Sequence, residues 1–354
     1  MQPPAATTTQ PATPPAAGGP AATARPGDPN RFQPRAQERF APGLATGERR
    51  GARVDELRAL RRERVEDGGR RVVIDEPDRR IIREGNRTVI IHDETERLRR
   101  VYSGADVRTE RRGEEEVTIV RRPNGVEIIT VRDEYGNVIR RVRREPNRRE
   151  VVLFDDVGGR PRGSFVTEVV ELPPPVIRIP REKYVVEVDR ASSEDLYEAF
   201  TAPPIERIER RYSLEEVRRS ASLRERVRRV DVDTVTFDSG SWTLAADEVG
   251  ALTGVANAIL RAVEQNPGEV FLVEGHTDAV GNDVDNLSLS DRRAETVATV
   301  LSERFQVPAE NLTTQGYGEQ YLKISTQGPE RENRRVTIRR ITPLLQNEAA
   351  AGTR

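Results

Sequence analysis

The chain of 354 residues is long enough for two domains, but with 35% hydrophobic and 33% charged residues only part of it is expected to bury a proper core. Lysine and arginine number 58 against 59 aspartate and glutamate, and this balance argues against a general polyanion binder such as a DNA-coating protein. Because cysteine is absent, the sequence excludes disulfides, thiolate nucleophiles, iron–sulfur clusters, Cys-based zinc sites and lipid attachment through a cysteine.

Residues 1–52 begin with a stretch rich in Pro, Ala, Thr and Gly, which cannot bury enough apolar surface to offset the entropy of ordering. We expect a disordered tether there. The first residues lack the charged and apolar regions of a signal peptide, and no run approaches the ~18 apolar residues of a membrane-spanning helix. In residues 53–67, Val54, Leu57 and Leu60 lie one turn apart and predict a short amphipathic helix that covers a neighbouring sheet.

Short runs of valine and isoleucine recur through residues 68–190 and are separated by turn formers such as Pro123-Asn124-Gly125. This pattern predicts an antiparallel β-meander of about ten strands. The stretch "PPPVIRIP", residues 173–180, interrupts it as an edge strand or a stiff spacer. Because arginine or glutamate stands beside nearly every apolar pair, the core is thin. The meander is therefore expected to need a partner surface: a second copy, an envelope protein or the neighbouring domain.

Residues 191–228 have a helical pattern, and Ser213 with Glu216 three positions later predicts a capping box that opens a short helix. This stretch is interpreted as a connector. Residues 229–343 then alternate strand, helix, strand, helix, strand and strand, beginning with "VDTVTF" at 232–237, before a tail at 344–354. The chain is therefore expected to be α+β, with a compact carboxy-terminal βαβαββ sandwich.

Two opposite charges stand out in this last part. Asp278 directly follows the apolar strand "EVFLVEG", at the strand end where α/β sheets tend to place ligands. Ser290 is expected to cap the next helix and to place Arg293 in its first turn, where the helix dipole disfavours a cation. Asn286 lies between the two charges in the sequence. The two residues either form an ordinary surface ion pair with each other, or bind the two opposite charges of a zwitterionic ligand.

The stretches "GHTDAVGNDVDNLSLSDRRAETVATVL", "LTTQGYGE" and "NRRVTI" together resemble the OmpA-like carboxy-terminal peptidoglycan-binding domain family, over about residues 229–343. The resemblance implies that Asp278 takes the ammonium of diaminopimelate in the peptide stem of peptidoglycan and that Arg293 takes its carboxylate. It also implies that Thr277, Asn286 and Asn333 shape the pocket. The chain departs from the family pattern at Leu322 and Pro329, which alters the loop before the last strand.

The predicted function is therefore non-catalytic binding of peptidoglycan, which tethers the envelope of a Gram-negative bacterium to its cell wall. The expected place is the periplasm, in association with the outer membrane, with no cofactor, metal or nucleic acid. One alternative is a periplasmic scaffold whose β-meander binds an envelope protein. A second is a hydrolase with His276 and Asp278 as an acid/base pair, although His276 is more simply a packed turn residue. Arg334 and Arg335 are interpreted as a basic strand face, with contact to glycan as the alternative.

Overall fold

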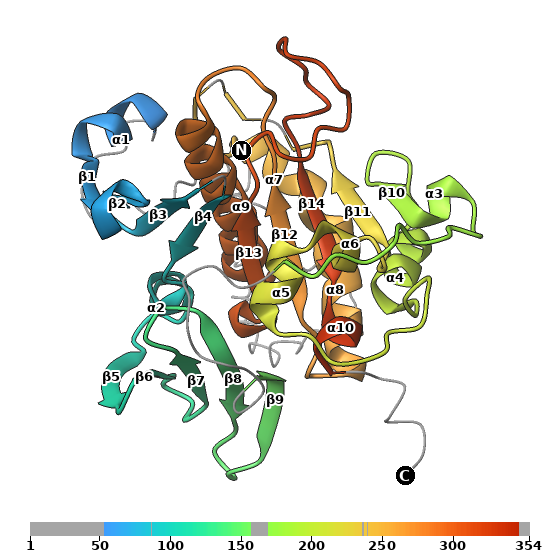
Figure 1. The fold of residues 1–354 in the computed structure, drawn as a ribbon. Helices are drawn as coiled ribbons and strands as arrows, with labels where there is room; N and C mark the ends of the chain where they lie inside the picture. The colour runs from blue at the N-terminus through green and yellow to red at the C-terminus, as the bar shows by residue number, and fades with distance from the viewer. Residues whose placement is uncertain (1–52, 86, 157–168, 236, 239, 347–354) are drawn as a thin grey trace, which may run out of the picture. The chain divides into compact units, whose positions relative to one another are not determined.

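The computed structural model describes residues 53–85, 87–156, 169–235, 237–238 and 240–346 (Figure 1). The tether predicted for residues 1–52, and the tail beyond residue 346, lie outside the described residues. Among the helices of the described part, none has both the length and the apolar character that crossing a membrane requires.

The described chain begins with helix α1 (Val54–Leu60) and a four-stranded antiparallel sheet in the order β1-β2-β3-β4. The strands are β1 (Arg62–Glu66), β2 (Arg71–Glu76), β3 (Arg79–Glu84) and β4 (Arg87–His92). The helix predicted over residues 53–67 is therefore too long. It ends at Leu60 because the next residues pair with β2 along their whole length, from Arg62 opposite Asp75 to Glu66 opposite Arg71.

The predicted meander is two antiparallel sheets rather than one, because helix α2 (Thr95–Val101) separates them and buries Leu98. The second sheet has the order β5-β6-β7-β8-β9. Its strands are β5 (Asp106–Arg112), β6 (Glu115–Arg121), β7 (Glu127–Arg132), β8 (Val138–Arg144) and β9 (Glu150–Asp155). The stretch 173–180 is a coil, since its prolines cannot donate to a sheet, and is a spacer rather than an edge strand.

The stretch 191–228, interpreted as a connector, is part of the folded carboxy-terminal body. Its helices, with the short helix before it, are α3 (Arg181–Tyr184), α4 (Ser193–Thr201), α5 (Leu214–Arg219) and α6 (Ala221–Arg224). The capping box of Ser213 and Glu216 is present at the start of α5. Leu214 and Leu223 belong to the same hydrophobic cluster as Leu272 of the carboxy-terminal sheet, so this stretch covers one face of that sheet.

The last part has the predicted order of strand, helix, strand, helix, strand and strand, and the α+β class is confirmed. Its elements are β11 (Arg229–Val232), α7 (Ala246–Val249), α8 (Thr253–Gln265), β12 (Phe271–Gly275), α9 (Asp283–Phe305), β13 (Leu312–Gly316), β14 (Val336–Arg340) and α10 (Thr342–Gln346). The sheet order is β10-β11-β14-β12-β13, in which β10 (Val185–Glu187) is an added parallel edge strand. The first strand, predicted over residues 232–237, instead spans Arg229–Val232, because these residues pair with β10 and β14.

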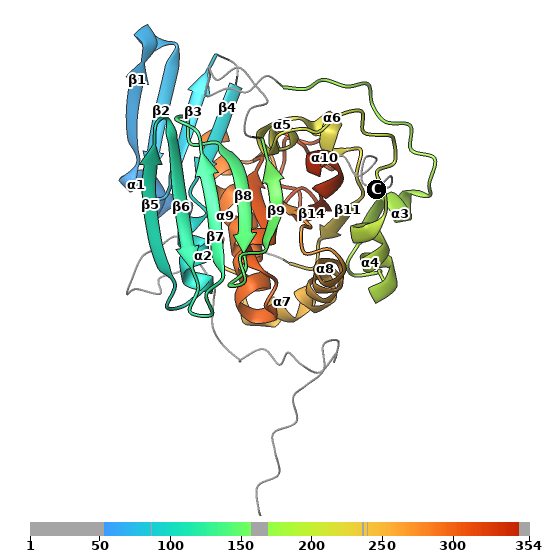
Figure 2. The same cartoon turned by 90° about the horizontal axis from the view of Figure 1, so that it is seen from below.

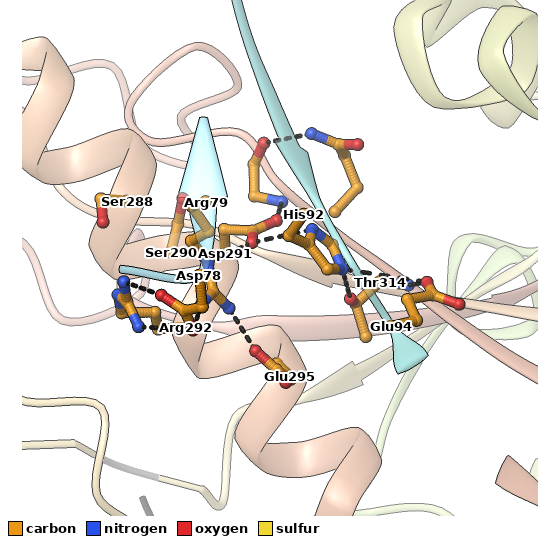
Figure 3. A network of polar contacts seen from close by, with 12 residues as sticks. Asp78, Arg79, His92, Glu94, Ser288, Ser290, Asp291, Arg292, Glu295 and Thr314 are labelled. Carbon is orange, nitrogen blue, oxygen red and sulfur yellow. Dashed lines mark hydrogen bonds and ion pairs between the residues drawn. The ribbon is translucent and has the colours of Figure 1, made fainter. Parts of the chain in front are cut away.

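Helix α9 contacts β4 of the first sheet, and it contacts α2, which in turn contacts β6 of the second sheet (Figure 2). Val284 and Leu287 of α9 pack with three isoleucines of the first sheet, which are Ile74, Ile81 and Ile90. Around this contact the interface is ionic (Figure 3). Arg79 of β3 donates to Asp291 at 2.8 Å and also bonds Glu295. The neighbouring domain is thus the partner surface that the charged strands were expected to need.

A second buried ionic cluster lies around Glu94, between α2, β8 and the carboxy-terminal body. Its carboxylate accepts from Arg141 at 2.6 Å, from Arg218 at 3.0 Å and from the Thr313 hydroxyl at 2.9 Å. Burial raises the pKa of Glu94, but the charges of Arg141, Arg97 and Arg218 outweigh it and hold the pKa well below its ordinary value. Glu94 therefore stays ionised and connects three separate segments of the chain.

Candidate functional site

Two glycines bring α9 into close contact with the sheet and so position the candidate site. A Cβ on Gly275, at the end of β12, would lie 1.9 Å from the carbonyl oxygen of Ser290. A Cβ on Gly316, at the end of β13, would lie 2.3 Å from the backbone nitrogen of Asp291. Only glycine allows this approach of backbone to backbone. The helix is therefore held at a fixed depth and register against the strand that precedes Asp278.

Helix α9 begins earlier than expected, and this changes the setting of Arg293. Asn282 is the capping residue, because its side chain accepts from the backbone N–H of Asp285 at 2.9 Å. Ser290 lies about two turns inside the helix, where its hydroxyl donates to the carbonyl of Leu287 at 2.8 Å and accepts from the Gly318 N–H at 2.8 Å. The prediction that Ser290 caps the helix is wrong, and the argument from the helix dipole does not apply to Arg293. The extra turns form because Leu287 and its neighbours pack on the first sheet.

Arg293 is buried, with 2% of its surface exposed, so it is not one half of an ordinary surface ion pair. Its Nε donates to the carbonyl of Ser241 at 3.0 Å and its Nη2 to the carbonyl of Asp238 at 3.3 Å. Within the described part of the chain, no carboxylate forms an ion pair with it. Burial lowers the pKa of Arg293 to about 10, the charge of Arg334 lowers it too, and the charge of Asp278 opposes them. Arg293 is thus a buried cation within the electrostatic reach of Asp278.

Asp278 is 6% exposed and pairs with a different arginine. Its Oδ2 accepts from Nη1 of Arg334 at 2.5 Å and from the backbone N–H of Glu330 at 3.3 Å. Among the described residues, its Oδ1 accepts one long bond, from the N–H of Val280 at 3.3 Å. In the described structure Asp278 therefore forms its ion pair with Arg334 and not with Arg293. Sequence reasoning missed Arg334 as the partner, because a run of two arginines before a strand carries no signal that tells their directions apart.

The three remaining candidate residues are all buried, and two of them gather around Asp278. Thr277 donates its backbone N–H to Gly318 at 2.9 Å, and its hydroxyl has no hydrogen-bond partner among the described residues. The Asn286 amide donates to Glu319 at 2.5 Å and to the carbonyl of Asp278 at 3.4 Å. Thr277 and Asn286 thus lie in the same loop cluster as the aspartate.

Asn333 is fully buried and has a different role in the local structure. Its side-chain oxygen accepts from the backbone N–H of Ile324 at 2.9 Å, and its side-chain nitrogen donates to the carbonyl of the same residue at 2.8 Å. Both polar atoms are therefore occupied. The side chain fastens the long loop between β13 and β14, which is the loop that carries Glu330 and Arg334.

His276 is a packed turn residue in this structure. It is 4% exposed and stacks on Tyr317, with 5.6 Å between the ring centroids. Burial lowers the pKa of His276 well below its ordinary value, and the charges of Arg335 and Arg229 lower it further. In the described residues no hydrogen bond joins His276 to Asp278, which leaves the acid/base interpretation without geometric support.

One group of carboxylates outside this site has oxygen atoms close enough to share a cation. Glu187, Asp189 and Asp233 offer atoms that lie within 4.8 Å of one another. Glu187, however, already accepts from Lys323 at 3.2 Å and from Arg190 at 2.8 Å. The group is thus partly neutralised by its own neighbours.

Comparison with known proteins places the candidate site within a matched region. Residues 236–335 match the model of the OmpA family. The probable lipoprotein YiaD of Escherichia coli is 37% identical over 108 residues, which are 30% of this chain and 47% of that protein. The outer-membrane lipoprotein YfiB of Pseudomonas aeruginosa is 38% identical over 106 residues, which are 29% of this chain and 60% of that protein.

Solved structures also match part of the chain. The peptidoglycan-associated lipoprotein from Burkholderia pseudomallei is 24% identical, covers 30% of this chain and 87% of its own, and gives a TM-score of 0.26. The chain spans about half the length of the curated relatives named above, with shares of 47% and 60%. By the family match, which contains Asp278 and Arg293, residues 236–335 are a domain of the OmpA family.

Proposed function

We propose that the OmpA-family domain binds peptidoglycan without catalysis, through the diaminopimelate of the peptide stem, and that the chain thereby tethers the cell envelope to the wall. The place this implies is the periplasm, close to the outer membrane. In support, one curated relative of the domain is named an outer-membrane lipoprotein. The finer statement, that diaminopimelate is the ligand, depends on the chemistry of the site.

The observation that carries the proposal is the state of Arg293. Among the described residues, the buried guanidinium of Arg293 donates only to backbone carbonyls and lies over the ring of Phe237 at 5.0 Å, so it has no counter-ion there, and such a charge is costly to bury. A carboxylate from a ligand would supply the missing partner through two parallel charged hydrogen bonds. Asp278 lies near enough for its charge to act on Arg293, so an ammonium and a carboxylate on one ligand would find complementary groups. The free end of diaminopimelate carries that pair of charges.

Asp278 can receive an ammonium in one of two ways. Within the described part of the chain its Oδ1 accepts one long hydrogen bond, so it keeps acceptor capacity. Alternatively, the ammonium replaces Arg334 at Oδ2. The side chain of Arg334 is 36% exposed, so it can move into solvent at modest cost. We assign to Thr277 and Asn286 the shaping of the pocket wall, and to Asn333 the fastening of the loop that carries Arg334.

The test is co-sedimentation of the whole chain with purified sacculi, with free diaminopimelate as competitor. Asp278→Asn and Arg293→Gln each remove one charge from the site. Asp283→Asn and Arg331→Gln are the matched controls, because both residues are exposed and lie on the same helix start and loop. Since a charged hydrogen bond contributes about 1.5–3 kcal/mol, each site variant should lose at least about tenfold in affinity.

Circular dichroism and the fluorescence of Trp242 must show that each variant remains folded. Free diaminopimelate should displace the wild-type chain, and the control variants should bind like wild type. Folded Asp278→Asn and Arg293→Gln chains that sediment at wild-type affinity would contradict the proposal.

A further inference from the structure

A cavity of about 500 Å³ lies beside β12 and β14, and its lining includes His276 but not Asp278. We call it the arginine pocket, after the side chains that line it. Its floor is formed by residues at the ends of β12 and β14, and its outer wall by the coil at 174–177 and by α3. Figure 1 shows this coil crossing α6 and β14 on its way to α3. The size suits a ligand with the bulk of a monosaccharide or a dipeptide.

The outer wall is held in place by hydrogen bonds to the carboxy-terminal body. The N–H groups of Val170 and Leu172 donate to the hydroxyls of Ser220 at 2.8 Å and Ser222 at 3.2 Å. Arg226 donates to the carbonyl of Pro173 at 3.1 Å. The consecutive prolines that follow restrict the backbone further. The cavity therefore lies beneath a stiff, fastened wall.

The charges that line the arginine pocket are strongly unbalanced. Five arginines and two glutamates line it, namely Arg181, Arg224, Arg229, Arg335, Arg339, Glu225 and Glu274. Glu274 is shared by Arg224 at 2.8 Å and Arg339 at 3.0 Å, so its single charge faces two cations. Arg229 is paired with Asp231 at 2.6 Å, so the excess of positive charge in the cavity comes from Arg181, Arg335 and the two arginines that share Glu274.

Two deeply buried polar groups face this cavity without full partners. Arg335 is 5% exposed and donates only to the carbonyls of Tyr321 at 3.1 Å and Asn333 at 3.5 Å, while its Nε has no partner among the described residues. His276 also lines the cavity, and its Nδ1 likewise lacks a partner in the described structure. Unsatisfied buried donors are rare and call for an explanation.

Arg334 and Arg335 contact different sites although they are neighbours in the sequence. Arg334 contacts Asp278, whereas Arg335 lines the arginine pocket. Both arginines precede β14 in a turn, where the N–H of Arg334 donates to the carbonyl of Arg331 at 3.0 Å, so the backbone changes direction between the two sites. The arginine pocket and the candidate diaminopimelate site therefore share no lining residue among those named.

We propose that the arginine pocket binds a small oxyanion, the carboxylate or phosphate of a ligand about the size of a monosaccharide, with Arg335 and His276 as its innermost hydrogen-bond donors. The fork of Arg335 suits either anion. Tyr184 and Tyr321 also line the cavity, so aromatic carbon lies beside the body of the ligand. The proposal is independent of peptidoglycan binding at Asp278.

The chain has only two histidines, which makes nuclear magnetic resonance of the imidazole groups a site-specific assay. Inorganic phosphate, N-acetylmuramic acid and neutral N-acetylglucosamine are titrated separately into the full chain. An oxyanion in the pocket should shift the His276 signal and raise the pKa of His276, because it cancels part of the positive field. The His92 signal should not move, and N-acetylglucosamine should shift neither signal.

Variants separate this pocket from the other site. Arg335→Gln should weaken oxyanion binding at least about tenfold, while Arg331→Gln and Asp278→Asn should leave it unchanged. If Arg335→Gln does not fold, Arg181→Gln at the exposed rim serves instead and should weaken binding by a smaller factor. A response to only phosphate or only N-acetylmuramic acid supports the proposal and identifies the source of the anion. The absence of any His276 shift with either anion, or unchanged binding in the folded pocket variants, would overturn it.

Discussion

The ionic interface between β3 and α9 allows a quantitative prediction from two adjacent arginines. The Arg79 side chain has no exposed surface and binds Asp291 at 2.8 Å, as well as Asp78 and Glu295. The side chain of Arg80, the next residue of the same strand, is 51% exposed and binds Asp75 at 2.9 Å. The change is Arg79→Ala, and Arg80→Ala is its matched control.

The expected cost follows from what each change leaves behind. Arg79→Ala leaves the fully buried carboxylate of Asp291 with only His92 as a charged partner within ion-pair distance in the described residues, at 3.1 Å. Removing one member of a buried ion pair lowers the free energy of unfolding by about 3–5 kcal/mol. Because Glu295 loses its arginine partner as well, the cost should lie in the upper part of that range. Arg80→Ala removes an exposed pair and should cost at most about 1 kcal/mol.

The assay is urea denaturation at neutral pH, followed by circular dichroism and by the fluorescence of Trp242, the only tryptophan of the chain. Trp242 packs with Leu57 of α1 and Leu289 of α9, so its signal reports on the interface itself. Both probes should show a much lower free energy of unfolding for Arg79→Ala than for Arg80→Ala. Equal stabilities of the two variants, within about 1 kcal/mol, would show that water reaches this interface and that the burial argument fails.

Three further predictions concern single residues. Burial lowers the pKa of His92, but the charge of Asp291 outweighs burial and raises the pKa above its ordinary value. The contact of protonated His92 with Asp291 therefore stabilises the fold fully below about pH 6.5, and this stabilisation is lost as pH rises through the raised pKa. His92→Gln should therefore flatten the loss of stability as pH rises above about 6.5 in urea melts, and an unchanged profile would contradict this assignment. Arg334→Gln frees Asp278 and should strengthen competition by free diaminopimelate for the sacculus site, whereas weaker competition would mean that Arg334 binds the ligand. Gly275→Ala places a methyl group 1.9 Å from the Ser290 carbonyl and should abolish folded protein in gel filtration and circular dichroism, while the open position Gly250→Ala should tolerate the change.

Local patterns in the sequence were sufficient for the order of elements in the last third of the chain. The apolar run at Phe271–Gly275 and the helical spacing in α8 and α9 depend only on residues a few positions apart. The capping box of Ser213 is equally local, and it is present. The same reasoning placed Asp278 directly after a strand. It failed at α2, where "TERLRRV" has helical spacing inside what was interpreted as a run of strands.

The surroundings of the candidate site were decided by tertiary structure. Arg293 is buried against the carbonyls of Asp238 and Ser241, and Asp278 is paired with Arg334, and neither partner follows from any spacing in the sequence. Tertiary contacts also decided where α9 begins. Its first turns, which the local sequence pattern did not predict, are stabilised by their contacts with the first sheet.

The sequence by itself thus determined the kinds of elements, their order in the last third and the identity of the charged residues, because periodicity and turn chemistry act over a few residues. Only the folded chain decided which charges meet and which are buried. Arg79 and Asp291 are 212 positions apart, and Arg58 and Asp285 are 227 apart. Whether such residues touch depends on how the sheets pack on α9, and burial then sets the pKa and the energetic weight of each charge.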